Sequence, residues 1–344
     1  AQDDHRDQRR QVATDPHLVP ASAPEIAERT LRPLPHHLEK IGGMGQHYLA
    51  GCQGERVVAL CDLDHRLSAR VFEKYPRATR YHDYRKMLDR KDIDVVTIGA
   101  PDHWHTSMAI AACKAGKHVY CEKPLTHAVW ESRQMTEIAR KYKVATQMGN
   151  GAHSGPNYRG VAKMVRDGVI GEVREVHCWC DQAWGNFDRP PHSPPVPPNL
   201  DWDLWLGPAP YRPYHPCYHP ANWRSWWDFG NGCLGDMGSH VNDLAFWALK
   251  LRDPLNCEAK GDPSEASPYT NPHWLVSTWE HPARGDMPPV TLKWYDGGKR
   301  PESPPDVDLA KWGLLGMLFI GDKGQLLSNY GTHVLLPKKQ YEGF

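Results

Sequence analysis

The 344-residue sequence has no net charge, no long apolar run and no internal repeat. Basic and acidic residues both number 41, so the chain lacks the basic excess that predicts a nucleic-acid-binding surface. No stretch approaches the roughly 20 apolar residues that a membrane-spanning helix requires. Hydrophobic residues make up 40% and charged residues 24% of the chain. These values are typical of a soluble globular protein, and the length favours two domains.

Cysteine pairs of the Cys-x-x-Cys type are also missing, and the nine cysteines are an odd number. This pattern argues against a zinc ribbon and against a disulfide framework. Reduced thiols favour a reducing compartment such as the cytoplasm. The first residues, AQDDHRDQRRQVATDPH, contain neither Met nor an apolar signal core. A processed end is therefore an alternative, and export stays open.

Short apolar runs alternate with helical segments between residues 56 and 149. Such alternation predicts a parallel sheet with helices on both faces. The expected strands are 56–64, 93–101, 118–121 and 144–149, and the expected helices are 67–75, 83–91, 105–117 and 128–143.

The second half of the chain has a different pattern of apolar residues and prolines. Residues 190–220 contain eleven prolines, too many for regular structure. The remaining pattern predicts an open, mostly antiparallel sheet with a helix layer, and GDKG (321–324) predicts a hairpin. The expected helices are 157–171 and 236–251, and the expected strands are 172–180, 272–281, 289–296, 315–321 and 324–329. We predict an aberrant or disordered arm (1–38), a dinucleotide-binding domain (39–150) and a substrate and oligomerisation domain (151–344).

A glycine-rich turn, KIGGMGQHYLAG (40–51), precedes an acid at the end of an apolar strand. Ligands of doubly wound sheets bind beyond the carboxyl ends of the strands. Gly42, Gly43 and Gly45 would let backbone approach a pyrophosphate and let a helix pack closely on its strand. Asp62 would bind ribose hydroxyls and repel a 2′-phosphate, which favours NAD over NADP. The competing interpretation is an ordinary glycine-rich turn and an ordinary strand-end acid.

The stretch HVYCEKPLTH (118–127) places a carboxylate, an amine and a proline where a strand leaves the sheet. Lys123 would lie beside the ligand crevice, where its ammonium could bind a substrate hydroxyl or carbonyl. Pro124 would restrict the backbone, and Glu122 would orient the amine. A solvated ion pair in a surface turn is the alternative for this triplet taken alone.

Five motifs, in this order, resemble the Gfo/Idh/MocA oxidoreductases, named for glucose–fructose oxidoreductase and inositol dehydrogenase. The resemblance covers roughly residues 41–335. The motifs are APDHWH (100–105), AGKHVYCEKPLTH (115–127), QMGN (147–150), GVIGEVREVHCW (168–179) and GNGCLGDMGSHVND (230–243).

The resemblance implies a Rossmann-type domain that binds NAD(P), followed by an α+β substrate domain. It also implies chemistry at a secondary alcohol of a sugar or polyol. Lys123 would lie near nicotinamide and substrate, with a cis bond to Pro124. His240 would be the general base, assisted by Lys123 and Asp236, which shares its helix face. Pro101, His105 and Glu122 are further expected cofactor contacts, and Asn150, Trp223, Arg224 and Asp243 are expected substrate contacts.

Three alternatives to the dehydrogenase interpretation were considered. Some relatives cleave glycosides through a transient keto-sugar, and the same lysine and histidine would serve that reaction. A remnant with impaired cofactor binding is the second alternative. A metal site that draws on Asp236, His240, Asp243, His103 and His105 is the third, but no complete ligand set is identifiable, and we expect no metal.

Two features depart from the family pattern. The segment TLRPLPHHLEK (30–40) has two prolines where a buried first strand belongs, and Lys40 replaces the first glycine. The first strand is therefore predicted to be degenerate. A different reading frame before residue 41, a natural remnant, or another segment filling the sheet would each explain it, and we favour the first. Relatives also run on for several dozen residues beyond the point that matches Phe344.

The open sheet predicted for the second domain would expose a broad, partly apolar face. Such faces are usually covered by another molecule. We therefore expect a homo-oligomer that is built on this face, with a carbohydrate-like small molecule as the substrate.

Overall fold

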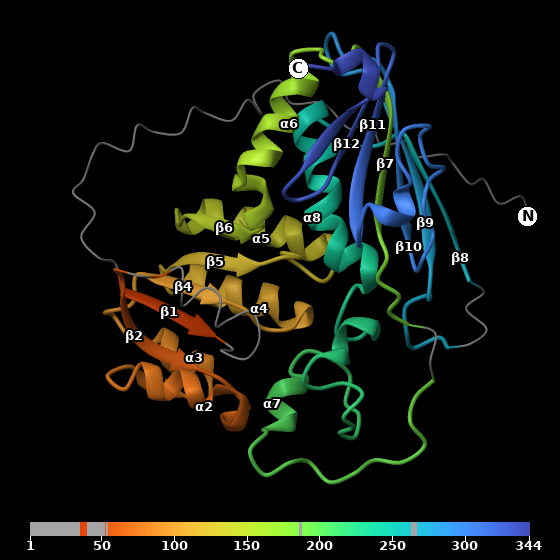
Figure 1. Ribbon diagram of the computed structural model, residues 1–344. Helices are drawn as coiled ribbons and strands as arrows, with labels where there is room; N and C mark the ends of the chain where they lie inside the picture. Colours follow the sequence, from red (N-terminus) through yellow and green to blue (C-terminus); the bar gives the residue numbers. More distant parts are fainter. Residues whose placement is uncertain (1–34, 40–51, 53, 186–187, 263–266) are drawn as a thin grey trace, which may run out of the picture.

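A computed structural model describes residues 35–39, 52, 54–185, 188–262 and 267–344. The described part of the chain contains two sheets, and each sheet packs with helices around a hydrophobic core of its own (Figure 1). Within these ranges no helix has the length and apolar character needed to cross a lipid bilayer.

The first sheet has six strands, all parallel, in the order β3-β2-β1-β4-β5-β6. This is the strand order of a doubly wound dinucleotide-binding sheet, and it confirms the predicted Rossmann-type fold. The strands are β1 (Pro35–Glu39), β2 (Arg56–Cys61), β3 (Thr79–Tyr81), β4 (Val95–Ile98), β5 (His118–Glu122) and β6 (Thr146–Gly149).

The strand β1 begins at Pro35, inside the segment 1–38 that is expected to be an aberrant or disordered arm. Pro35 is the first residue of the strand, where a missing N–H is tolerated. The strand lies between β2 and β4, with a register shift between His36 and His37. Residues 35–39 therefore fill the central position, and no other segment takes it.

In the described residues, four helices follow strands of this sheet. Asp64 caps the first of them, α2, by accepting hydrogen bonds from the backbone of Arg66 and Leu67. Small residues of α4, such as Ala109 and Ala112, are fully buried and let this helix lie close to the sheet. The helices are α2 (His65–Lys74), α3 (Tyr84–Leu88), α4 (Asp102–Lys114) and α5 (Val129–Tyr142).

The second sheet has seven strands in the order β13-β12-β11-β7-β10-β9-β8. Only β7 and β10 pair in parallel, so the sheet is mostly antiparallel as predicted. The GDKG segment does close a hairpin between β11 and β12. The strands are β7 (Val173–Cys180), β8 (Asn256–Gly261), β9 (Leu275–His281), β10 (Val290–Asp296), β11 (Leu315–Gly321), β12 (Gln325–Ser328) and β13 (His333–Leu336).

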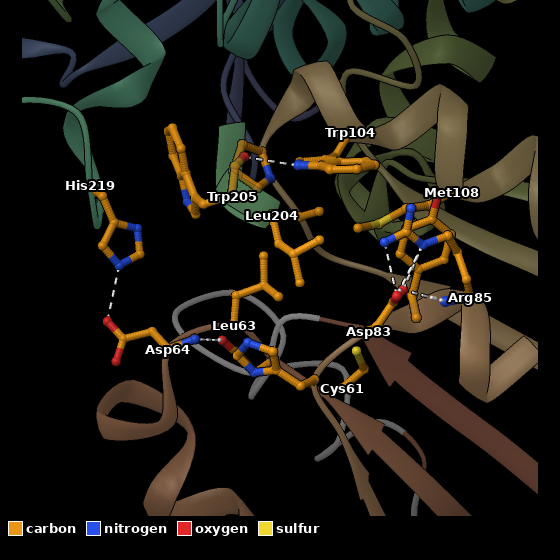
Figure 2. Close-up of a pocket in the computed structure, with 15 residues that line it drawn as sticks. Cys61, Leu63, Asp64, Asp83, Arg85, Trp104, Met108, Leu204, Trp205 and His219 are labelled. Atoms are coloured by element: carbon orange, nitrogen blue, oxygen red, sulfur yellow. Dashed lines mark hydrogen bonds and ion pairs between the residues drawn. The ribbon is translucent and has the colours of Figure 1, made fainter. Parts of the chain in front are cut away.

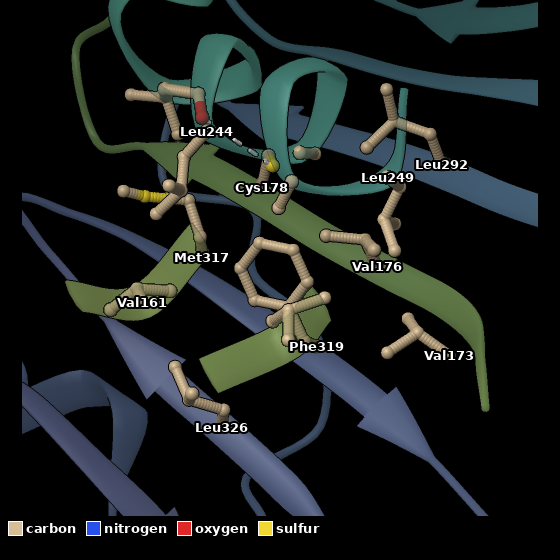
Figure 3. Close-up of a cluster of buried hydrophobic side chains, with 14 of the residues drawn as sticks. Val161, Val173, Val176, Cys178, Leu244, Leu249, Leu292, Met317, Phe319 and Leu326 are labelled. Atoms are coloured by element: carbon tan, nitrogen blue, oxygen red, sulfur yellow. Dashed lines mark hydrogen bonds between the residues drawn. The ribbon is translucent and has the colours of Figure 1, made fainter. Parts of the chain in front are cut away.

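The helices α6 (Pro156–Arg166) and α8 (Gly232–Leu249) pack on one face of this sheet. Figure 3 shows apolar side chains of the two layers interlocking there, among them Val161, Leu244 and Phe319. The β-strands supply alternate residues to this core, so the opposite residues form the outer face. Single-turn helices are found at Gly151–Ser154, Asn222–Ser225, Leu309–Lys311 and Lys338–Tyr341.

The proline-rich segment is more regular than predicted, because it contains the short helix α7 (Trp202–Leu206). The segment packs around an aromatic cluster of its own. The buried rings are Trp202, Trp205, Tyr214, Tyr218, Trp223, Trp226 and Phe229. In Figure 1 the green α7 lies beside the first sheet, away from the second sheet.

Candidate functional site

Residues at the carboxyl ends of β5 and β6 meet the first half of α8. Lys123 directly follows β5, and its Nζ lies 3.0 Å from the Asp236 Oδ2 atom and 3.0 Å from the Asp236 carbonyl oxygen. The two side chains are only 10% and 6% exposed. The bond between Lys123 and Pro124 is cis, as the resemblance implied. The amine from the nucleotide domain and the carboxylate from the second domain therefore share one environment.

The carboxylate of Asp236 lies between two cations. Arg224 donates through Nε to the other carboxylate oxygen, Oδ1, at 3.1 Å. The guanidinium of Arg224 also lies over the ring of Trp223, 4.2 Å from its centre. A second carboxyl group, that of Asp102, is fully buried nearby. Burial, together with the negative charge of Asp236, raises the pKa of Asp102 well above its usual range.

The imidazole of His240 is oriented by Asn150, at the end of β6. The Nδ2 group of Asn150 donates to the Ser239 carbonyl at 2.9 Å. Its oxygen therefore faces the Nδ1 atom of His240, 3.1 Å away, and accepts a hydrogen bond from it. The proton is thus fixed on Nδ1, and Nε2 keeps its lone pair. Tyr330 packs edge-on against the same ring.

The electrostatics of the site keep this imidazole neutral. Burial is the largest effect, and the positive charge of Lys123 adds to it, so the pKa of His240 falls to about 4. The negative charge of Asp236 offsets these effects only in part. At neutral pH His240 is therefore uncharged, and its Nε2 carries a lone pair.

The remaining predicted substrate contact of α8, Asp243, is engaged by a neighbour. Its Oδ2 lies 2.9 Å from Nδ1 of His153. Burial raises the pKa of Asp243, although the hydrogen bond to His153 acts in the opposite direction.

The five residues of the competing metal interpretation are not brought together. His103 contacts the carbonyl oxygens of Phe229 and Trp205, and His105 contacts those of Pro124 and Ala100. In the described ranges no group of three or more His, Cys, Asp or Glu is arranged to hold a metal ion.

A separate cavity lies at the carboxyl ends of β2 and β4 (Figure 2). The predicted cofactor contacts Asp62 and Pro101 both line it. Asp62 is buried, and its Oδ1 accepts the backbone N–H of Asp64 at 2.8 Å. Leu63, Trp104 and Met108 contribute apolar side chains to its lining. An apolar slot beside a carboxylate matches the adenine and ribose of a dinucleotide.

The charges around this cavity match NAD better than NADP. Asp62 and Asp64 both carry carboxylates there, and a 2′-phosphate would be repelled by them. Among the described residues of the lining, Arg85 carries a permanent positive charge, but its guanidinium is bound by both carboxylate oxygens of Asp83. The residues present therefore fit the adenosine half of NAD.

The other predicted cofactor contacts have different positions. His105 lies outside the residues that line this cavity and contacts two backbone carbonyls instead. Glu122 is buried at the end of β5, and Gly149 of β6 lies so close that any side chain there would overlap it. Gly42, Gly43 and Gly45 lie outside the described residues.

Sequence reasoning missed the part of the cavity wall that comes from the second domain. Leu204, Trp205 and His219 line the cavity opposite the first domain. One signal for Asp64 was present in the motif CDLD (61–64), which places a second acid two residues after Asp62 at the end of the strand. Nothing in the spacing of residues 199–219 indicated that this segment reaches the nucleotide domain.

Two family models match the chain. Residues 41–150 match the model described as the NAD-binding Rossmann fold of an oxidoreductase family, and residues 159–268 match the C-terminal alpha/beta domain of the same family. A levoglucosan dehydrogenase of Pseudarthrobacter phenanthrenivorans is 27% identical over 244 residues, which are 70% of this chain and 51% of that protein. A glycosyl hydrolase family 109 protein of Shewanella putrefaciens is 34% identical over 130 residues, which are 35% of this chain and 28% of that protein.

The chain thus spans about half of the first of these relatives and less of the second. Among solved structures, levoglucosan dehydrogenase in complex with NADH and L-sorbose superposes with a TM-score of 0.62 at 20% identity, covering 87% of this chain and 74% of that one. This likeness confirms the two-domain fold, and the first domain model confirms the predicted NAD-binding class. On the two matched domains, in this order, the chain belongs to the Gfo/Idh/MocA family of oxidoreductases.

Proposed function

We propose that this protein is an NAD-dependent oxidoreductase acting on a secondary alcohol of a sugar, a polyol or a related small molecule. The observation that carries the proposal is the neutral, oriented imidazole of His240 beside the buried pair of Lys123 and Asp236. Oxidation of an alcohol needs a base for the hydroxyl proton and a donor that binds the oxygen as it becomes a carbonyl.

In this proposal His240 takes the hydroxyl proton on Nε2. Its Nδ1–H stays bound to Asn150, so the ring does not turn away as it becomes charged. Lys123 has three donors, and Asp236 accepts two of them through its carboxylate and its carbonyl. The third donor is available to the substrate oxygen.

The cofactor supplies a hydride acceptor when it is bound. Asp62 would hold the adenosine ribose, and Pro101 and Trp104 would flank the base. On the substrate side, Arg224 offers a planar donor that the buried ring of Trp223 supports from below. A guanidinium of this kind suits the hydroxyl groups of a sugar or polyol.

A second candidate is hydrolysis of a glycoside through a transient keto-sugar. The similarity to the Shewanella putrefaciens glycosyl hydrolase family 109 protein favours it, at 34% identity over 130 residues. The same His240 and Lys123 would remove and return protons. The two functions differ in their net reaction, because only the dehydrogenase produces reduced cofactor as a net product.

The test uses the full chain and a panel of sugars, polyols and aryl glycosides. NAD⁺ binding is measured by calorimetry, cofactor reduction by nicotinamide absorbance, and sugar release by chromatography. Net reduction with one of the alcohols is expected. Sugar release without net reduction would support the hydrolase, and a folded chain that does not bind NAD⁺ would indicate the impaired remnant.

The variant His240→Asn tests the assigned base. It should lower kcat by roughly 10² to 10⁴-fold, the range for loss of a general base, while NAD⁺ affinity is retained. The matched control is His192→Asn, a change at an exposed histidine, which should leave kcat unaltered. Equal kcat in both variants would contradict the assignment.

A further inference from the structure

The cavity at the ends of β2 and β4 is shared by both domains. Its inner wall is first-domain chain, with Asp62, Pro101 and Trp104. Its outer wall is the segment 199–219 of the second domain, here called the strap, which contributes Leu204 and His219 among others. Figure 2 shows these side chains on the far side of the cavity from the sheet.

A buried polar cluster joins the strap to Asp64, two residues after Asp62. The Nε2 atom of His219 lies 3.0 Å from Asp64 Oδ2, and the two side chains are 3% and 2% exposed. Asn199 donates to the other oxygen of Asp64 at 2.7 Å. Burial acts to raise the pKa of Asp64, but the hydrogen bonds outweigh it and hold that pKa below its usual value.

Backbone contacts hold the strap on both sides of the cavity. On the β2 side, His65 N–H donates to the Asn199 carbonyl at 3.2 Å. On the α4 side, the indole N–H of Trp104 donates to the Trp205 carbonyl at 2.9 Å. Gly207, with a φ of +50°, lies directly against the Trp104 ring, where any side chain would overlap it. The strap therefore bridges the two walls of the nucleotide slot.

The strap also has a rigid interior. Trp202 and Trp205 stack with ring centres 4.7 Å apart and planes 11° apart, and Tyr218 packs on Trp202. The cavity measures about 40 Å³, whereas small-molecule sites span roughly 300–1,000 Å³. An adenosine therefore needs more room than this cavity offers, and outward movement of the strap, which forms one of its walls, would provide it.

We propose, on the basis of the function proposed above, that the strap completes the cofactor site and that its contact with Asp64 sets how fast the dinucleotide leaves. His219 is a positioning residue in this arrangement, because it acts through Asp64. A cofactor held in this way suits turnover in which a substrate is oxidised and reduced again before the cofactor leaves. A slow dissociation rate of the dinucleotide would therefore favour the hydrolase over the dehydrogenase.

The test measures the dissociation rate of NADH by stopped-flow fluorescence, with excess NAD⁺ as the displacing ligand. His219→Ala should speed dissociation by about tenfold or more, since changes within one interface act mainly on dissociation. His219→Gln keeps a donor toward Asp64 and should restore part of the slow rate. The control is His192→Gln, an exposed position of the proline-rich segment outside the strap.

The strap variant Leu204→Ala provides a test that leaves the buried polar cluster intact. It widens the slot from the strap side and should also speed dissociation. Thermal unfolding of each variant is measured in parallel, because a purely structural role would lower Tm without changing the dissociation rate. Unchanged rates in His219→Ala and Leu204→Ala would overturn the inference alone. Absence of NADH binding by the unaltered chain would overturn both the inference and the proposed function.

Discussion

The protonation of His240 is the residue-scale property on which the proposed chemistry depends. An imidazole with an ordinary pKa would be partly charged below neutral pH, and a charged ring cannot accept the hydroxyl proton. Here burial and the charge of Lys123 lower its pKa to about 4. The imidazole of His240 is therefore neutral from about pH 4 upward, the form that the proposed chemistry requires.

This gives a pH prediction whose sign follows from the direction of the shift. The base is lost only when pH falls through the lowered pKa, so kcat/KM should decline near pH 4 and not near 6.5. An NMR titration of the ring, assigned with His240→Asn, should have its midpoint near the same pH. Lys123→Met removes the neighbouring charge and should move the midpoint upward. A midpoint between 6 and 7 in the unaltered chain would contradict the prediction.

At the scale of the element, β11 shows how closely the second sheet is packed. Its residue Gly316 is buried against the indole ring of Trp179 on β7. A methyl group there would overlap the ring, and neighbouring strands fix the ring from both sides. The glycine is thus a requirement of cross-strand packing.

Gly316→Ala should accordingly lower the free energy of unfolding by about 1–3 kcal/mol, the usual range for overpacking. Gly160→Ala is the matched control, because nothing lies within 4 Å of the added carbon in the middle of α6. That variant should raise stability by roughly 0.5–1 kcal/mol. Urea denaturation measures both changes. A Gly316→Ala protein as stable as the unaltered chain would mean that β11 and β7 can shift apart.

On the scale of the whole molecule, the outer face of the second sheet divides into two parts. One part is apolar and is covered by the chain itself, through Val307, Leu309 and Trp312 packing on Leu318 and its neighbours. The other part carries cross-strand polar pairs, such as Lys293 with Glu175 at 2.6 Å. The exposed part is therefore less apolar than the sequence suggested.

The expected homo-oligomer stays a prediction, and this polar part is where it can be tested. Light scattering should report a mass above that of one 39.1 kDa chain. Lys293→Glu places two carboxylates side by side on the face and should shift the population toward monomer. Lys114→Glu, an exposed change on the first domain, is the control. A monomeric unaltered chain would contradict the prediction.

The local patterns of the chain determined most of its elements. Alternating apolar runs and glycine stops predicted β2, β4, β5 and β7 and the helices between them. Each of these elements buries one face or its whole length, and burial requires apolar residues at a regular spacing. Short elements with few apolar residues were not predicted: β3 and β8 are largely exposed, and β1 begins with a proline. Their pairing depends on neighbouring strands and not on their own composition.

The sequence by itself determined the family, the fold class and the candidates Lys123, Asp236 and His240, because each depends on a motif of neighbouring residues. Only the tertiary structure decided which partners these residues have. Asn150 orients His240, and Arg224 shares Asp236 with Lys123. Likewise, His219 reaches Asp64 across 155 positions of the chain. Such contacts join residues far apart in sequence, and no local spacing encodes them.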